Sequence, residues 1–172
     1  MRVINLFGGP NIGKTTCAAR IFDAMVCADL KVEVITDYAK YNVLIDRKDT
    51  LKHQLHIFAK QELVLDRLRK KTDFVILDSP ILLPLIYNKK RLIQRPFEEL
   101  ALTLFNSYEN LNFMLPRING FNKPCLYTKE ESLQIDTKIT QFLENNNIPF
   151  TAVKKQPAKK IVDAIFKVIL NS

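Results

Sequence analysis

The sequence predicts an α/β protein in which a five-stranded parallel sheet is covered by helices on both faces. Short apolar runs alternate along the chain with longer segments whose apolar residues recur at helical spacing. The predicted helices are long enough to serve as crossovers between parallel strands. No linker, repeat or low-complexity tract divides the 172 residues, so we expect a single domain over residues 1–172.

The expected elements follow one another in regular order. The first strand is predicted over residues 3–7, because Val3-Ile4-Asn5-Leu6-Phe7 is a short, mostly apolar run that ends at two glycines. A helical period predicts a long helix over residues 50–71, and three successive asparagines predict the end of a later helix. The other predicted strands are 30–36, 74–77, 111–115 and 148–153, and the other predicted helices are 14–29, 97–108, 130–145 and 158–170.

A glycine-rich turn joins the first predicted strand to the first predicted helix. The stretch Gly8-Gly9-Pro10-Asn11-Ile12-Gly13-Lys14-Thr15 matches the pattern Gly-x-x-x-x-Gly-Lys-Thr. Glycines allow the backbone to turn tightly and to point successive N–H groups at phosphate oxygens, and the start of the helix adds partial positive charge. An ordinary glycine-rich turn is the other interpretation, but both flanking elements also match. The sequence therefore predicts a loop that binds a nucleoside triphosphate.

Three side chains of this loop have individual predicted roles. Lys14 is expected to reach the β- and γ-phosphates and to be catalytic, Thr15 to hold Mg²⁺ through its hydroxyl, and Thr16 to contact the α-phosphate. The residues predicted to contact ATP are Gly8, Gly9, Asn11, Ile12, Gly13, Lys14, Thr15 and Thr16.

Two aspartates stand directly after predicted strands, where ligands of open parallel sheets bind. Asp78 closes the strand 74–77 and is expected to hold Mg²⁺ directly or through water, although an Asp there also caps helices. Asp37 follows the strand 30–36 and is expected to accept a proton from an attacking hydroxyl. The alternative for Asp37 is a solvated loop residue.

The composition is that of an ordinary globular chain with an unusual charge. Hydrophobic residues make up 47% of the sequence, and no apolar run approaches the roughly 20 residues of a membrane span. We therefore expect no membrane partner and a cytoplasmic location. Three scattered cysteines, Cys17, Cys27 and Cys125, lack the spacing of a metal site and suggest reduced thiols. The net charge of +8 favours a polyanionic partner, although a solvated lysine-rich surface explains it equally well.

Several stretches together resemble small bacteriophage P-loop kinases, which are related to the thymidylate kinase and deoxynucleoside kinase branch. They are Gly8–Thr16, Thr36-Asp37-Tyr38-Ala39-Lys40, Gln54-Leu55-His56-Ile57-Phe58-Ala59-Lys60-Gln61 and Asp78-Ser79-Pro80. The resemblance extends from Met1 to about Val153. It implies the P-loop NTPase fold, the use of ATP and Mg²⁺, a short lid at about residues 117–129 and, for a phage protein, the host cytoplasm.

The resemblance also assigns roles to residues. Asp37 falls where the relatives usually carry glutamate as base and acceptor ligand, so its carboxylate is one methylene shorter. Gln54 matches a glutamine that pairs with a nucleobase, and a helix-surface glutamine is an equal alternative. Phe58 is expected to stack on the base or else to belong to the core. In the relatives, lid arginines close over the phosphates. Arg117 is the best candidate for this catalytic role, in a lid poor in arginine.

A basic cluster, Lys89-Lys90-Arg91 with Arg95, follows the predicted magnesium ligand. Arg91 and Arg95 are expected to bind the acceptor, because basic groups there suit a monophosphate or a DNA backbone. No DNA-reading module is recognisable, and a base in duplex DNA would have to be extruded. DNA would then be held by the basic rim or by the second subunit of a homodimer.

Together these observations predict a kinase that transfers the γ-phosphoryl group of ATP to a hydroxyl of a nucleotide-type acceptor. One subgroup of the relatives phosphorylates 5-hydroxymethyluracil in phage DNA, a step toward hypermodified thymidines, and the charge of +8 favours this acceptor. Free deoxynucleosides or monophosphates are the first alternative, since neighbouring branches phosphorylate nucleosides, nucleotides or nicotinamide riboside. The second alternative is a P-loop NTPase switch that binds a partner and hydrolyses ATP.

Overall fold

The computed structural model describes residues 1–117 and 126–171. Residues 118–125 of the expected lid, Ser172 and the side chain of Arg91 lie outside the described residues. The described strands form one parallel sheet of spatial order β2-β3-β1-β4-β5, which confirms the predicted five-stranded parallel sheet. The strands are β1 (Arg2–Phe7), β2 (Val32–Ile35), β3 (Phe74–Leu77), β4 (Glu109–Met114) and β5 (Thr151–Ala152).

Helices separate the strands along the chain, as predicted. None of the helices in the described ranges is long and apolar enough to cross a membrane. They are α1 (Lys14–Cys27), α2 (Tyr38–Leu44), α3 (Gln54–Leu68), α4 (Leu83–Tyr87), α5 (Gln94–Asn106), α6 (Lys129–Asn145) and α7 (Ala158–Asn171), with 3₁₀ turns η1 (Lys48–Lys52) and η2 (Arg91–Ile93).

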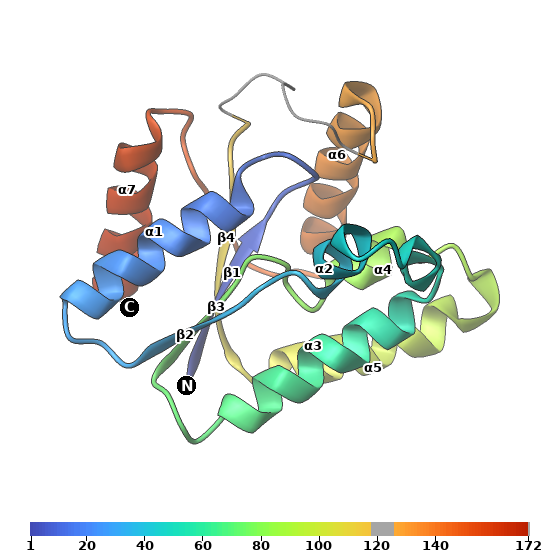
Figure 1. Ribbon diagram of the computed structural model, residues 1–172, viewed down its shortest axis with the longest axis horizontal. Helices are drawn as coiled ribbons and strands as arrows, with labels where there is room; N and C mark the ends of the chain where they lie inside the picture. The colour runs from blue at the N-terminus through green and yellow to red at the C-terminus, as the bar shows by residue number, and fades with distance from the viewer. Residues whose placement is uncertain (118–125, 172) are drawn as a thin grey trace.

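The helices cover both faces of the sheet (Figure 1). Helices α1 and α7 lie on one face, and α3, α4, α5 and α6 lie on the other. Successive residues of β1 alternate between the two faces. Ile4 and Leu6 pack in the cluster under α1 and α7, whereas Val3 and Phe7 pack in the cluster on the opposite face. Burial on both faces explains why β1 is a nearly continuous apolar run.

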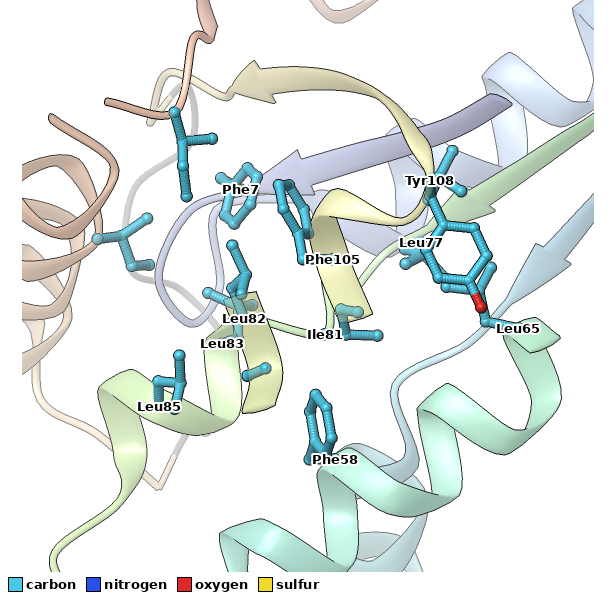
Figure 2. Packing of buried hydrophobic residues seen from close by; sticks show 14 of the residues in the cluster. Phe7, Phe58, Leu65, Leu77, Ile81, Leu82, Leu83, Leu85, Phe105 and Tyr108 are labelled. Atoms are coloured by element: carbon cyan, nitrogen blue, oxygen red, sulfur yellow. The ribbon is translucent and has the colours of Figure 1, made fainter. Parts of the chain in front are cut away.

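The larger apolar cluster fills the space between the sheet and α3, α4 and α5 (Figure 2). Phe7 and Leu77 enter it from β1 and β3, Phe58 from α3 and Phe105 from α5. The Phe58 ring meets the Phe97 ring edge to face with 5.3 Å between centroids. This packing fixes the carboxyl ends of β1 and β3 relative to α3.

The register of the strands places their carboxyl ends at one edge of the sheet. Leu77, the last residue of β3, lies opposite Ile35, the last residue of β2, and opposite Asn5 of β1. Because all three strands run in the same direction, Asp37 and Asp78 come to the edge at which the glycine-rich loop leaves β1.

Some element bounds differ from the predicted ones for local reasons. The helix predicted over 50–71 begins only at Gln54, because η1 occupies residues 48–52. The strand predicted over 148–153 is reduced to Thr151–Ala152. The Ile148 N–H donates to the Leu143 carbonyl at the end of α6, and Pro149 has no N–H to donate.

Helix α5 begins before the predicted start at Phe97. Pro96 lies in its first turn, where a missing N–H breaks no helical hydrogen bond. The sequence does not predict α2 or α4, because neither is long enough to show a helical period.

Candidate active site

The loop between β1 and α1 has the backbone of an anion-binding turn. Gly8 and Gly13 have φ angles of 144° and 102°, and Asn11 has a φ of 59°. These angles favour glycine and asparagine. Gly13 is the N-cap of α1 and has no side chain with which to cap the helix. The N–H groups of the first turn therefore remain available to an anion at the positive end of the helix.

Lys14 lies half-buried at the centre of the loop. Its Nζ donates hydrogen bonds to the carbonyl oxygens of the loop's first two glycines, at 2.7 and 2.9 Å. Burial lowers the pKa of Lys14, and the nearby carboxylates of Asp37, Asp78 and Asp136 raise it. The structure therefore brings Lys14 together with both carboxylates that the sequence analysis selected, and with a third that it missed.

Asp78 follows β3 and is 1% exposed. Neither carboxylate oxygen meets the distance and angle criteria of a hydrogen bond with a described residue, which is unusual for a buried charge. Burial raises the pKa of Asp78, while the neighbouring Thr15 hydroxyl and the ammonium groups of Lys14 and Lys40 lower it. Asp78 and Thr15 line a common cleft of about 340 Å³ between α1 and β2. Because Mg²⁺ prefers such oxygen ligands, this pair fits the predicted metal site.

Helix α2 carries two charged side chains at the rim of the loop. Asp37 is its N-cap and accepts the Ala39 N–H at 2.8 Å, so it is a half-buried cap rather than a solvated loop residue. Lys40, one turn later, places Nζ 3.4 Å from Thr15 Oγ1. The capped start of α2 therefore fixes a carboxylate within electrostatic reach of Lys14.

Arg117 follows β4 and lies beside the first half of the loop. Its Nη2 is 2.7 Å from Asp136 Oδ2, and its Nη1 donates to the Pro10 carbonyl at 3.0 Å. Asp136, on α6, also accepts the Gly9 N–H at 2.5 Å. The sequence does not mark Asp136 as a site residue, because in the sequence it is only an acidic residue next to Ile135, an apolar position of the predicted helix.

A larger cleft, of about 550 Å³, lies between the start of α3 and the segment 88–93. Lys90 Nζ is 3.2 Å from His53 Nδ1 at this cleft, and Gln54 lines it while donating from Nε2 to the Leu51 carbonyl at 2.8 Å. The volume falls within the roughly 300–1,000 Å³ of small-molecule sites.

Helix α2 lies between the glycine-rich loop and this larger cleft. Asp37 begins the helix beside Lys14, and the next residue, Tyr38, places its hydroxyl 3.4 Å from Nε2 of His56, which lines the cleft. Tyr38, which follows the residue expected to act as base, therefore contacts the wall of the cleft.

Two other predicted acceptor residues, Phe58 and Arg95, are not among those that line this cleft. Phe58 is 2% exposed and packs on Phe97, so its position is that of the core alternative and not of a base-stacking side chain. Arg95 forms a surface ion pair with Glu99 at 3.0 Å, and its side chain is 91% exposed. The side chain of Arg91 is outside the described residues.

Gln61 is a second residue whose part in the site the sequence analysis missed. Its side chain is 2% exposed, and Nε2 donates to the Ser79 carbonyl at 3.1 Å. This hydrogen bond ties α3 to the residue after Asp78. The available signal is an amide on the apolar face of α3, among Ile57, Phe58 and Leu65.

The fold and the loop define a P-loop nucleotide-binding protein of the α/β class. The chain belongs to the AAA domain family, whose model matches residues 3–160. No curated protein sequence matches the chain.

Solved structures show the same fold at low sequence identity. The thymidylate kinase from Ehrlichia chaffeensis is 14% identical with a TM-score of 0.67, and the alignment covers 98% of each chain. The deoxyadenosine kinase from M. mycoides is 17% identical with a TM-score of 0.60, over 99% of this chain and 97% of that one. A NadR protein in complex with NR is 15% identical with a TM-score of 0.75, over 96% of this chain. The chain spans about half the length of that NadR protein, 50%.

Proposed function

We propose that the protein is an ATP- and Mg²⁺-dependent kinase that transfers the γ-phosphoryl group to a hydroxyl of a nucleotide-type acceptor. The observation that carries the proposal is the convergence of Lys14, Asp37 and Asp78 at one edge of the sheet, with Thr15 beside Asp78. The loop supports triphosphate binding, and the buried Asp78 carboxylate, with no well-formed hydrogen bond to a described residue, supports a metal. The likeness to a thymidylate kinase and a deoxyadenosine kinase supports the same class of reaction.

Each group has a part in the transfer. Lys14 and the N–H groups at the start of α1 bind and orient the phosphate oxygens on which charge develops. Mg²⁺ bound by Asp78 and Thr15 would neutralise negative charge on the triphosphate. Asp37 accepts the proton of the acceptor hydroxyl as its oxygen bonds to the γ-phosphorus. The bond from that phosphorus to the β–γ bridging oxygen breaks, and ADP leaves.

For the acceptor, we propose a hydroxymethylated pyrimidine in DNA such as 5-hydroxymethyluracil, modified in the host cytoplasm. The net charge of +8 supports a polyanionic substrate. The larger cleft has room for one nucleotide, and Lys90 lines it. A base in duplex DNA would enter this cleft only after extrusion from the helix.

Two alternatives have an observation in their favour. The volume of the larger cleft, about 550 Å³, also suits a free deoxynucleoside or monophosphate. Membership of the AAA domain family favours an ATPase that switches a partner, with water as the only acceptor. The proposal and its two alternatives differ in the molecule that accepts the γ-phosphoryl group: DNA, a small nucleoside or nucleotide, or water.

The experiment is to follow γ-labelled ATP with three acceptors under one set of conditions. Free deoxynucleosides, deoxynucleoside monophosphates and DNA that contains 5-hydroxymethyluracil are compared with the same DNA carrying thymine. We expect label in the modified DNA and none in the thymine control. Label in a small acceptor alone would replace the DNA proposal by the first alternative, and release as inorganic phosphate alone would contradict the kinase proposal.

A further inference from the structure

Helix α6, which is distant in sequence, contacts the first half of the glycine-rich loop. Residues 8–13 lie between the end of β1 and the start of α1, so no strand ladder or helix fixes them. In the second half, Ile12 is buried in the core and Gly13 begins α1. In the first half, Gly9 and Pro10 are bonded to side chains from α6 and from the end of β4.

The hydrogen bonds around Gly9 and Pro10 connect the loop to Asp136 and Arg117. Asp136 accepts the Gly9 N–H through Oδ1, and its Oδ2 accepts from Arg117 Nη2 at 2.7 Å and from Nε at 3.2 Å. Arg117 Nη1 donates to the Pro10 carbonyl at 3.0 Å. The Asp136 and Arg117 side chains are only 17% and 16% exposed, so their bonds are sheltered from water.

The close approach of α6 to Gly9 shows that the packing at this contact requires a glycine. A Cβ on Gly9 would lie 2.7 Å from Asp136 Oδ1 and 2.8 Å from the Ser132 carbonyl oxygen. A Cβ on Gly13 would meet nothing within 4 Å. Only a glycine therefore allows α6 to reach the loop at this point.

We propose that Asp136 is a positioning residue of the phosphate-binding loop. Its carboxylate holds the Gly9 N–H and the Arg117 guanidinium, and Arg117 holds the Pro10 carbonyl, so that the first half of the loop is set before the nucleotide arrives. The inference rests on the proposed function only in that the loop binds MgATP.

Two possible effects of the Asp136 carboxylate, repulsion of the phosphates and positioning of the loop, predict opposite changes in MgATP affinity for Asp136→Asn. A carboxylate near the phosphates repels them, so its charge alone predicts tighter MgATP binding after the substitution. Positioning predicts weaker binding. An amide can accept from Gly9 only by turning its NH₂ group toward the donors of Arg117, so one of the two bonds is lost.

The test combines isothermal titration with MgATP and NMR of protein labelled with ¹⁵N-glycine. The four glycines of the chain make the Gly9 amide assignable. We expect Asp136→Asn to weaken MgATP binding about tenfold, the order for one charge-assisted hydrogen bond, and to speed Gly9 amide exchange with a change in its shift. Glu144→Gln, an exposed carboxylate on the same helix, is the matched control and should change neither.

A double-mutant cycle with Arg117→Ala separates positioning from a purely structural role. We expect Arg117→Ala to weaken MgATP binding strongly in the parent and hardly at all in Asp136→Asn, since Arg117 is held against the Pro10 carbonyl by its ion pair with Asp136. Equal effects in both backgrounds, or unchanged or tighter binding by Asp136→Asn, would overturn the proposal. A parent protein that fails to bind MgATP would contradict the proposed function instead. The Gly9 amide would still decide whether Asp136 holds the loop.

Discussion

At the scale of single residues, Asp78 is a buried carboxylate whose environment disfavours its charge. A buried carboxylate is costly when no well-formed hydrogen bond compensates for the water it has lost, and the nearby Thr15 hydroxyl and lysine ammonium groups offset this cost of Asp78 only in part. Burial accordingly raises its pKa. In the proposed function, a bound Mg²⁺ would supply a further partner for this carboxylate. We therefore expect the Asp78 carboxylate to lower the free energy of unfolding of the metal-free protein, because the site is suited to metal binding and not to stability.

Asp78→Asn should stabilise the protein in the absence of Mg²⁺ and nucleotide. The pKa of Asp78 is higher in the folded than in the unfolded chain, so ionisation disfavours folding above the usual aspartate value of about 3.9. We expect a gain of about 1 kcal/mol at neutral pH, or roughly 2–4 °C in Tm. The gain should vanish as the pH falls below about 4, where both states are protonated. Thermal unfolding across this pH range measures it, and a destabilised variant at neutral pH would contradict this view of Asp78.

Asp37→Asn should act on transfer and spare nucleotide binding. The amide still accepts the Ala39 N–H and caps α2, so the local structure is kept. It no longer accepts a proton, and general bases contribute about 10²–10⁴-fold, so we expect kcat to fall by about this factor. Isothermal titration should give an unchanged Kd for MgATP. Lost ATP affinity with a normal rate at saturation would reverse the roles of Asp37 and Asp78.

The sequence predicts the placement of Lys14, Asp37 and Asp78 because each is fixed by its distance from a strand end. It does not predict Asp136 or Gln61, because their partners, Gly9 and the Ser79 carbonyl, are distant in sequence and are backbone groups. A contact between a side chain and a remote backbone atom leaves no local pattern.

At the scale of elements, the site depends on how α3 and α6 pack against the edge of the sheet. Helix α6 starts with a capping box in which Thr128 Oγ1 accepts the Glu131 N–H and Glu131 accepts the Thr128 N–H. This cap fixes the start of the helix that carries Asp136. Helix α3 is tied to the segment after β3 by Gln61.

Gln61→Leu should weaken both the fold and the metal site. The leucine fills a similar volume but leaves the buried Ser79 carbonyl unpaired, which costs about 1–3 kcal/mol. Because Ser79 follows Asp78, we expect a higher Mg²⁺ concentration for half-maximal transfer. Gln141→Leu, at an exposed position of α6, is the matched control. If Gln61→Leu has normal stability and normal Mg²⁺ dependence, the bond from Gln61 to the Ser79 carbonyl contributes to neither property.

The sequence predicts best the elements whose apolar residues form a clear run or recur at helical spacing. β1, β3 and α1 lie where their apolar patterns place them, and α6 starts one residue early. Shorter elements such as α2 carry too few residues to show a period. The 3₁₀ turn η1 sets the start of α3, and the bond from Ile148 back to the end of α6 shortens β5. The unpredicted α2 matters most, because it turns Asp37 from a loop residue into a helix cap.

At the scale of the whole molecule, the net charge of +8 leads to a prediction about the acceptor. If the substrate is DNA, affinity should fall with salt by a log–log slope of roughly −0.9 for each phosphate contact. Replacement of Lys89, Lys90, Arg91 and Arg95 by glutamine should flatten this slope by about three to four units, while the Kd for MgATP stays the same.

The matched control for this prediction is Lys159→Gln with Lys160→Gln on α7, which covers the other face of the sheet. It should leave most of the slope intact. A salt titration of DNA binding by the three proteins measures the effect. If the parent fails to bind DNA at low salt, the DNA proposal is wrong and the small-molecule alternative is favoured.

The rate of phosphoryl transfer by Lys14→Ala shows most directly whether the glycine-rich loop is the site of the reaction. Lys14 lies at the centre of the loop and is expected to stabilise charge on the β- and γ-phosphates in the transition state. With γ-labelled ATP and the acceptor found in the panel, we predict a loss of about a hundredfold or more in kcat, with an unchanged circular dichroism spectrum. Turnover within about tenfold of the parent would contradict the assignment of this loop as the site of phosphoryl transfer.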